Sequence, residues 1–379
     1  MEKIKVGIVG PGTIGHKLVW ALEKQDDMEF VGAAKTSPDW AARWINRKGY
    51  KMYAASKEGP SGLKDAVAKF EETLGSENVG GSIQDLLEAS DVIIDCSGNK
   101  VGAKNKAEYY EPYNKKAKEK VGAIFQGGEK ADVGQSFNTR TNYDLCKKLA
   151  GSDTPYLRCV SCNTTTLARF NGAIAQAGYD IDYLNVSLIR RALDPGMQGK
   201  IILDDIEVGL KLPSHHAPDL QTVMDVEAYS RSYKVQTSLM HVHDLQINFK
   251  KKAPTKEELT EVFADDNRVG MLETVSNTAE LKERARRLNK LDERVCPGGD
   301  IILAIAASGS YITLQNGKQA WVTLMCPQDS IVVPENIDAV RALTYDVKPV
   351  ERDASLAKTD KTIALDVMKK ELEESYRTV

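Results

Sequence analysis

Hydrophobic and polar residues follow different patterns in the two halves of the chain. In the first 157 residues, short apolar runs alternate with stretches of helical period, which is typical of buried parallel strands and their connecting helices. This alternation predicts an α/β domain built on a parallel sheet. The predicted strands are 4–9, 29–34, 92–96, 123–126 and 156–160. The predicted helices are 16–24, 63–74, 83–87, 100–120 and 142–149.

The second half mixes alternating strands, loops and helices. Alternation of apolar and polar residues predicts strands at 184–188 and 238–249, and helical periodicity predicts a helix at 166–177. Prolines bracket residues 213–219 and predict a loop there. In the first half, by contrast, residues 56–81 are glycine-rich at both ends, and we expect them to form a surface excursion between two strands of the parallel sheet. The second half therefore predicts an α+β domain with a mixed sheet.

The C-terminal segment carries two further helical patterns. One starts at Pro334, a residue suited to the first turn of a helix, and runs to Leu343. The other covers 357–376, where an apolar stripe of Leu365, Met368 and Leu372 favours packing into a core. The predicted domains comprise residues 1–158 together with 335–379, and residues 159–334.

Composition narrows the class of protein. The chain has 379 residues, 42% of them hydrophobic, and a net charge of -3, which argues against nucleic acid or an anionic membrane as the main partner. No apolar run is long enough to span a bilayer, and the chain begins without a signal-peptide pattern. Six cysteines are too few for a disulfide framework in a chain of this length. We expect a cytoplasmic protein.

Three glycines between the first strand and the first helix predict a dinucleotide-binding Rossmann fold. In Gly10–Gly15 (GPGTIG), Gly10 permits a tight turn, Gly12 lets the backbone approach a pyrophosphate, and Gly15 allows close packing of helix on strand. The helix N-terminus adds N–H donors and a favourable dipole. Strand, glycines and helix in this order make the motif more specific than the glycines alone. A purely structural glycine turn is the alternative.

The end of the second strand predicts which dinucleotide binds. NAD-specific sites usually place an acidic residue there for the ribose 2′-hydroxyl. This chain instead has Lys35, Thr36 and Ser37, with Asp39 beyond a proline, and a lysine with two hydroxyls suits a 2′-phosphate. We expect NADP to be preferred and NAD tolerated. A solvated lysine at a strand end is the alternative.

Two more strands end in glycine at the edge where ligands bind in such sheets. Ser97 and Gly98 follow the strand 92–96, and Gly127 and Gly128 follow the strand 123–126. Glycine at a strand end indicates close approach of the backbone to another group. We therefore expect both pairs to face the cofactor.

Cys162 lies where a predicted strand turns into a predicted helix. A thiol beside the free N–H groups at a helix N-terminus has a lowered pKa, and the thiolate is the nucleophilic form. A buried structural cysteine is the first alternative. The second is a redox or metal pair with Cys159, which forms a CxxC motif. Redox CxxC pairs lie on a helix N-terminus, whereas Cys159 belongs to the predicted strand, and no second CxxC completes a zinc site. No metal site is expected.

Histidine and arginine supply the remaining candidate chemistry. His241 and His243 lie on one face of the predicted strand 238–249, where they could bind a metal ion or act on a thiol as a base. Arg190 and Arg191 are adjacent on a strand and point to opposite faces, so at most one enters a site and the other is expected to pair on the surface. A thiolate, a base and a nicotinamide cofactor together suit the oxidation of an aldehyde through a thiohemiacetal and a thioester.

At these residues the chain resembles the archaeal-type (type II) glyceraldehyde-3-phosphate dehydrogenases. The matching stretches are GPGTIGHK, AAKTSPD, QGGEK, SCNTT, RRALDP, PSHHAPD, SLMHVH and QDSIVVPENIDAVRAL, in the family's order. The resemblance implies phosphorylating oxidation of glyceraldehyde 3-phosphate, or its reversal, with NADP or NAD in a homotetramer. It makes Cys162 the nucleophile and His241 the base, with His243 the second choice. It places Ser161, Asn163, Thr164, His216 and Ala217 at the substrate. The predicted cofactor site comprises Gly10, Gly12, Thr13, Ile14, Gly15, Lys35, Thr36, Ser97, Gly127, Arg191, Gln328 and Asn336.

The chain departs from the family pattern at several positions. Thr166 and Ala217 stand where the family has glycine, and residues 196–200 replace a loop near the phosphate sites. These departures leave two alternatives open. One is a related aldehyde or semialdehyde dehydrogenase with another substrate. The other is a nucleotide-binding redox sensor that acts through Cys159 and Cys162.

Overall fold

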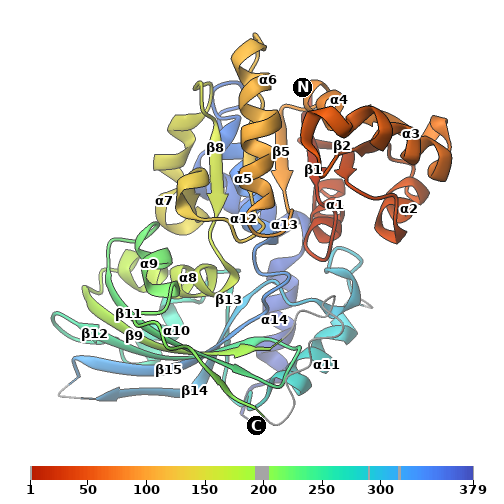
Figure 1. Cartoon of the computed structure of the whole chain (residues 1–379). Coiled ribbons are helices and arrows are strands. Elements are labelled where there is room, and N and C mark those ends of the chain that lie inside the picture. The colour runs from red at the N-terminus through yellow and green to blue at the C-terminus, as the bar shows by residue number, and fades with distance from the viewer. Residues whose placement is uncertain (1, 193–204, 289–290, 315–316, 379) are drawn as a thin grey trace. The chain divides into compact units, whose positions relative to one another are not determined.

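The computed structural model describes residues 2–192, 205–288, 291–314 and 317–378, and they form two compact units (Figure 1). The first unit comprises Met1–Thr139, Tyr143–Cys159 and Glu335–Thr359. The second comprises Arg140–Asn142, Val160–Pro334 and Asp360–Val379. The sequence had assigned 335–379 entirely to the first domain, whereas its last twenty residues pack with the second unit.

The first unit is built on an eight-stranded parallel sheet with the strand order β4-β3-β2-β1-β5-β6-β8-β7. Its central strands are almost fully buried, as continuous apolar runs require. Because all pairs are parallel, the carboxyl ends of the strands share one edge. The strands are β1 (Ile4–Val9), β2 (Met28–Lys35), β3 (Met52–Ala54), β4 (Val79–Ser82), β5 (Val92–Asp95), β6 (Gly122–Phe125), β7 (Gln135–Phe137) and β8 (Tyr156–Cys159). This arrangement confirms the predicted α/β class.

Helices connect the strands of the first unit. The predicted excursion at 56–81 contains the expected helix, α3, but its end is β4, the edge strand of the sheet. Two glycines in β4 hid this strand, because glycine lowers strand propensity. The helices that lie wholly or mostly here are α1 (Gly15–Glu23), α2 (Trp40–Arg47), α3 (Leu63–Leu74), α4 (Ile83–Glu88), α5 (Val101–Asn105), α6 (Glu111–Lys116), α7 (Thr139–Cys146), α12 (Val333–Leu343) and α13 (Arg352–Thr362). A π-helical turn at Lys106–Tyr110 joins α5 to α6.

The second unit contains a seven-stranded mixed sheet with the order β10-β11-β9-β12-β15-β14-β13. β11 pairs with β9, and β13 with β14, in parallel, while the other pairs are antiparallel. The strands are β9 (Ile181–Arg191), β10 (Glu207–Val208), β11 (Glu227–Val235), β12 (His241–Phe249), β13 (Val269–Leu272), β14 (Ala304–Leu314) and β15 (Gln319–Cys326). The predicted mixed sheet is confirmed.

The helices of the second unit correct two predictions. Residues 213–219 were expected to form a loop, but α9 (His216–Gln221) begins at His216, and Pro218 sits in its first turn, where no N–H is needed. The single helix expected at 357–376 is divided between α13 and α14 (Leu365–Ser375) by Ala364, which has a left-handed backbone. The other helices are α8 (Cys162–Gln176), α10 (Lys256–Val262) and α11 (Thr278–Leu288). Residues 196–200, the altered loop of the sequence analysis, lie outside the described residues.

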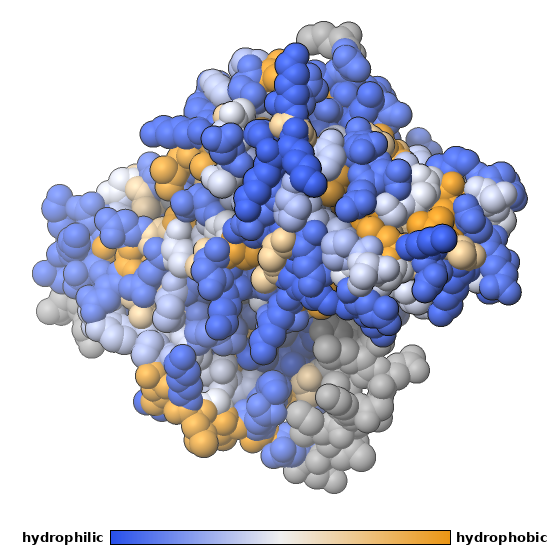
Figure 2. All heavy atoms as spheres, turned by 45° about the horizontal axis from the view of Figure 1, so that its top comes forward, coloured by the Kyte–Doolittle hydropathy of each residue, from blue (hydrophilic) through white to orange (hydrophobic). Residues whose placement is uncertain are grey.

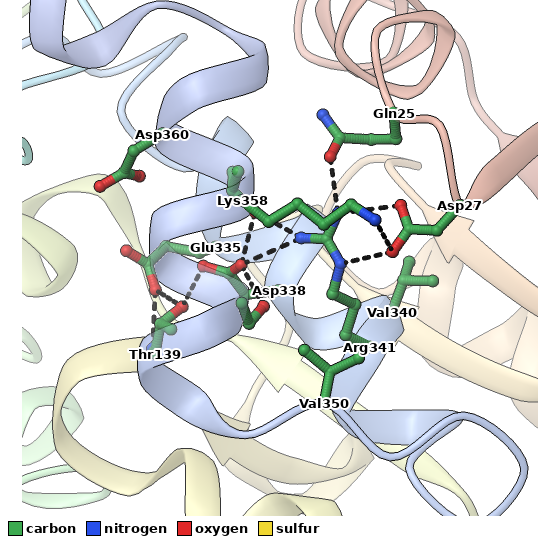
Figure 3. Close-up of polar contacts among 12 residues, drawn as sticks. Gln25, Asp27, Thr139, Glu335, Asp338, Val340, Arg341, Val350, Lys358 and Asp360 are labelled. Atoms are coloured by element: carbon green, nitrogen blue, oxygen red, sulfur yellow. Dashed lines mark hydrogen bonds and ion pairs between the residues drawn. The ribbon is translucent and has the colours of Figure 1, made fainter.

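A buried polar network holds the returning helices on the first unit's sheet (Figure 3). The Arg341 guanidinium on α12 is fully buried and donates two hydrogen bonds, of 2.9 and 3.0 Å, to the carboxylate of Asp27 just before β2. It also donates to Gln25 and to Thr359 on α13. Asp338 accepts hydrogen bonds from Ser355 and Thr359 on α13 and from Thr139. The bonds from Arg341 to Asp27 and Gln25 join segments that are more than 300 residues apart in sequence.

One face of the molecule carries few concentrated apolar areas. Figure 2 shows one face that is mostly hydrophilic, with apolar residues in small groups, as is usual for a globular protein. Within the described ranges, no helix is long and apolar enough to cross a membrane. The same residues contain no group of three His, Cys, Asp or Glu side chains arranged to hold a metal ion.

Candidate active site

Cys162 is the first residue of α8, at the strand-to-helix turn that the sequence predicted, although the helix was predicted to begin only at residue 166. Ser161 is the N-cap, with extended backbone angles, and its Oγ accepts a 3.3 Å hydrogen bond from the Thr164 backbone N–H. The first N–H groups of a helix have no partner within the helix, and they favour negative charge nearby. The half-buried Cys162 sulfur therefore lies where a thiolate is stabilised.

A carboxylate from α9 supports the start of α8. The Asp219 Oδ2 accepts a 2.5 Å hydrogen bond from the Thr164 hydroxyl and a 3.4 Å bond from the Ser161 N–H. Ser161 and Thr164 are themselves linked by a 2.9 Å hydroxyl contact. Asp219 thus fixes two of the predicted substrate residues and the cap of the helix that presents Cys162.

The Cys162 thiol has a strongly lowered pKa. The largest cause is a hydrogen bond with the Cys326 side chain. Burial acts in the opposite direction, and a hydrogen bond with His241, together with the charge of Arg191, lowers the pKa further. All four residues belong to the second unit. These surroundings favour the thiolate form of Cys162, the form that nucleophilic attack requires.

His241 is held in one tautomer by the backbone. Its Nδ1 accepts a 3.1 Å hydrogen bond from the Arg191 N–H, so Nε2 is the ring nitrogen left to donate. The ring also contacts Cys162. The role of base that the sequence analysis gave His241 stays a prediction.

His243 lies on the same face of β12, as predicted, but it has a different partner. Its Nε2 is 2.8 Å from the Asn163 Oδ1, an atom that can only accept, so Nε2 is the donor. Burial lowers the pKa of His243 to about 3, which keeps the ring neutral. His243 thus orients Asn163, the residue after the reactive cysteine.

The α9 segment places the other predicted substrate residues. His216 and Ala217 are both buried, and the His216 Nδ1 is 3.0 Å from the Ser214 hydroxyl. Burial, and then the charges of His215, Arg190 and other neighbours, lower the pKa of His216 to about 2, so the ring is neutral. The two adjacent arginines act on different histidines and thiols, as their opposite faces require. Arg190 is half-buried, although the sequence analysis expected surface pairing for one of the two arginines.

Cys159 has different surroundings from Cys162. It is the last residue of β8, belongs to the first unit and is buried. Burial, reinforced by the Glu335 carboxylate, raises the pKa of Cys159 well above its ordinary value. A raised pKa disfavours the reactive thiolate, so these surroundings favour a structural role for Cys159 over a redox role.

The carboxyl edge of the first unit's sheet is open where a dinucleotide would approach. A Cβ at Gly10 would come within 2.9 Å of the Ser97 backbone nitrogen, and one at Gly127 within 1.6 Å of the Ser97 carbonyl oxygen, so only glycine fits at either position. At Gly12 and Gly98, by contrast, a Cβ would meet nothing closer than about 4 Å. The three glycine segments therefore pack on one another and leave an uncovered backbone surface. These residues fit a nicotinamide dinucleotide.

Other predicted cofactor residues of the first unit surround this edge. Thr13 and Ile14 form the turn that leads into α1, and the buried Asn336 on α12 donates a 2.6 Å hydrogen bond to Gln126, directly before Gly127. The exposed Thr36 follows Lys35 at the end of β2. The Lys35 Nζ lies 2.8 Å from the Asp39 carboxylate, so this lysine carries an ion pair of its own.

Known proteins resemble this chain over nearly its full length. The glyceraldehyde-3-phosphate dehydrogenase of Thermococcus kodakarensis is 38% identical over 367 residues, which cover 96% of this chain and 99% of that protein. The chain belongs to the archaeal glyceraldehyde-3-phosphate dehydrogenase family. Relatives of the same name from Archaeoglobus fulgidus and Pyrobaculum calidifontis are 37% and 36% identical, again over 96% of this chain and over 99% and 97% of theirs. A scan against models of protein families gave no match.

Two cofactor residues implied by the glyceraldehyde-3-phosphate dehydrogenase resemblance, Arg191 and Gln328, belong to the second unit. Arg191 ends β9 beside Cys162, as described above. The buried Gln328 donates to the Ser238 carbonyl at 3.4 Å, while its Oε1 has no hydrogen-bond partner within the described part of the chain. A buried acceptor of this kind is suited to an amide donor of a ligand.

Sequence reasoning missed two residues of this glyceraldehyde-3-phosphate dehydrogenase site. Asp219 was visible as the last residue of the PSHHAPD motif, but the expected loop gave no reason to direct its carboxylate to α8. Cys326 had no sequence signal. It reaches the site because β15 pairs with β12 in a register that sets Cys326 opposite His241, and such long-range pairing is not encoded in a local pattern.

Proposed function

We propose that the protein is an NAD(P)-dependent phosphorylating glyceraldehyde-3-phosphate dehydrogenase, which converts glyceraldehyde 3-phosphate and inorganic phosphate to 1,3-bisphosphoglycerate. The observation that carries the proposal is the position of Cys162 at the start of α8, with His241 and Arg191 beside it. Family membership over nearly the full chain supports the choice of substrate.

The residues of the site suit each step at the aldehyde carbon. The Cys162 sulfur attacks the carbonyl carbon and forms a C–S bond, while the carbonyl oxygen becomes an alkoxide. The His241 Nε2–H and the N–H groups at the start of α8 donate to this oxygen. A bound nicotinamide supplies the oxidant by accepting hydride from the same carbon. Loss of hydride leaves a thioester on Cys162, and attack by inorganic phosphate releases the acyl phosphate and regenerates the thiolate.

Because the lowered pKa of Cys162 favours its thiolate, this route does not depend on a base to remove a proton from the thiol. The tautomer set by the Arg191 N–H suits His241 for donating to the alkoxide. His243 acts through Asn163 and keeps its amide in place beside the sulfur. The proposed roles are therefore a donor for His241 and a positioning residue for His243.

For the cofactor, we infer a preference for NADP, with NAD also accepted. Gly10, Gly12, Gly15 and the Gly127 turn would hold the pyrophosphate and nicotinamide portions. Lys35 is the cation available for a 2′-phosphate at the end of β2. Its ion pair with Asp39 tempers the preference, because the carboxylate both neutralises part of the charge and could accept a bond from a 2′-hydroxyl.

The oligomeric state, the cellular location and the pathway are inferred from the family resemblance. A homotetramer in the cytoplasm, acting in glycolysis or gluconeogenesis, accords with the resemblance. Exposed aromatic residues on the second unit's sheet, Tyr229 and Trp321, support contact between copies, since they are 49% and 45% exposed.

The test is cofactor reduction by the purified protein with glyceraldehyde 3-phosphate, with and without phosphate or arsenate. Turnover that depends on the anion supports the phosphorylating reaction. Turnover indifferent to the anion, or faster with aldehydes that lack a phosphate, would instead identify a different aldehyde dehydrogenase. Cys162→Ser is expected to abolish turnover and to leave cofactor binding intact. Retained activity in that variant would refute the assignment of the nucleophile.

A further inference from the structure

A second cysteine lies against the proposed nucleophile. Cys326 is the last residue of β15 and its side chain is fully buried. In the antiparallel ladder it is the direct partner of His241, and α8 packs against the same strand. Its side chain hydrogen-bonds with Cys162, and the Thr166 hydroxyl also bonds with it. Cys162 is therefore bounded by a strand pair that presents an imidazole and a thiol side by side.

We propose that Cys326 is a positioning residue of the active site, whose S–H donates a hydrogen bond to the Cys162 sulfur and holds it as the reactive thiolate. This inference rests on the proposed function only in naming Cys162 as the nucleophile. It assigns to the site a further hydrogen-bond donor, in addition to the histidine and the N–H groups at the helix N-terminus.

The direction of the hydrogen bond follows from the surroundings of the two sulfurs. Cys162 is at the start of α8, where the helix dipole and the Arg191 charge favour an anion. Cys326 is fully enclosed at the end of a strand, without a helix terminus of its own, and burial together with Cys162 raises its pKa strongly. The pair therefore holds one proton, which stays on Cys326, and one negative charge, which stays on Cys162.

The arrangement also divides the donors between two tasks. During attack on an aldehyde, charge moves from the sulfur to the carbonyl oxygen. A donor that remains directed at the sulfur loses its partner's charge at this step, whereas the His241 Nε2–H can follow the charge to the oxygen. Cys326 accordingly sets how much thiolate exists before the reaction and contributes little to the oxyanion.

The experiment measures the pH dependence of Cys162 alkylation by iodoacetamide, under reducing conditions, with the modified residue identified by mass spectrometry. Cys326→Ala and Cys326→Val remove the donor, and Val preserves most of the volume. Each is expected to raise the apparent pKa of Cys162 by about one unit or more, the size typical of a hydrogen bond to a charged group. Cys326→Ser keeps a donor and is expected to restore at least half of the shift.

Cys146→Ala is the matched control, because Cys146 is another buried thiol, lies in the first unit and bonds to the Ser136 carbonyl. It is expected to leave the alkylation profile unchanged. Circular dichroism and the melting temperature identify any variant that has not folded, and the Val and Ser variants keep the comparison available if the Ala variant fails. The shift must also appear in kcat as a loss at low pH that recovers at high pH.

An unchanged alkylation profile in folded Cys326→Val would overturn the proposal, as would a Ser variant no better than Val. Alkylation needs no substrate and no cofactor, so this outcome is independent of the proposed reaction. The two hypotheses can therefore fail separately. If the wild-type protein does not oxidise glyceraldehyde 3-phosphate, the proposed reaction is refuted. If Cys162 alkylation at low pH is nevertheless lost in Cys326→Val, the role of Cys326 is supported.

Discussion

The buried guanidinium of Arg341 offers the sharpest test of how the first unit is held together. Arg341→Met keeps much of the side-chain volume and removes the charge. The four hydrogen bonds to Asp27, Gln25 and Thr359 are lost, and Asp338 loses the cation 3.6 Å from its carboxylate. Both Arg341 and Asp338 are fully buried, so water cannot replace the missing cation without opening the packing of α12 and α13.

The expected loss in the free energy of unfolding is about 3–5 kcal/mol, the usual cost of leaving a buried charge without its partner. For a domain of this size, that corresponds to a fall in melting temperature of roughly 6–20 °C. Arg341→Lys keeps the charge but not the two-pronged contact with Asp27, and it is expected to cost about half as much. A double-mutant cycle with Asp27→Asn isolates the coupling between the two residues.

The effect must also depend on pH in one direction. Burial alone would raise the pKa of Asp27, but the hydrogen bonds and charges of Arg341 and Lys358 outweigh it and hold the pKa below the ordinary value of 3.8. A lowered folded-state pKa gives stability that is present above the unfolded-state pKa and is lost as the pH falls through the folded-state value. In Arg341→Met this acid-dependent part is expected to be much smaller.

The assay is thermal and urea unfolding followed by tryptophan fluorescence, which reports on this unit through the buried Trp20 of α1. The control is Arg352→Met, since Arg352 is on α13 in the same unit and pairs with the largely exposed Asp353. It is expected to cost less than about 1 kcal/mol. Equal losses of unfolding free energy in the two variants would refute the idea that the network stabilises the unit because it is buried. An Arg341→Met variant whose stability falls with acid as steeply as the wild type would refute it too.

Two further predictions concern the chemistry. His241→Ala is expected to lower kcat by about 10²–10⁴-fold, because it removes a donor to the reacting oxygen. His243 acts only through Asn163, so His243→Ala is expected to lower kcat by about tenfold. Steady-state kinetics in which His243→Ala has the larger effect would exclude the assigned roles. Lys35→Ala is expected to raise KM for NADP by about tenfold or more and to raise KM for NAD much less. Asp39→Asn is expected to lower KM for NADP, because it frees Lys35 from its ion pair. If Lys35→Ala changes KM equally for both cofactors, Lys35 does not bind the 2′-phosphate.

Much of the first unit could be predicted because its signals are local. The GPGTIG segment lies between a strand and a helix that each have a clear period, and Gly10 occupies the positive-φ turn that glycine allows. The limits of α3 were predicted to the residue. Where the signals fail, the cause is physical. The glycines of β4 have low strand propensity, and that strand exists because it can add an edge to a sheet already formed.

The helix break near Ala364 was missed for a related reason. Residues 357–376 contain no proline or glycine, so the local pattern favours one continuous helix. The chain turns there because Leu365, Met368 and Leu372 all bury completely, as the apolar stripe predicted, and α14 packs against β13 and α11. The core favours the turn over the propensity of one alanine, whose left-handed angles cost roughly 1 kcal/mol.

In the candidate active site, too, some features are encoded by local sequence and others depend on long-range pairing. Cys162 and its helix cap are encoded in adjacent residues, so Cys162 could be proposed as the nucleophile from sequence. What tunes it cannot be read locally, because Cys326, His241 and Arg191 come from three different strands and meet only through the register of the mixed sheet. A one-residue slip between β12 and β15 would turn the Cys326 side chain to the other face of the sheet while leaving every sequence motif intact. The reactivity of Cys162 is therefore a property of sheet register as much as of the cysteine's own motif.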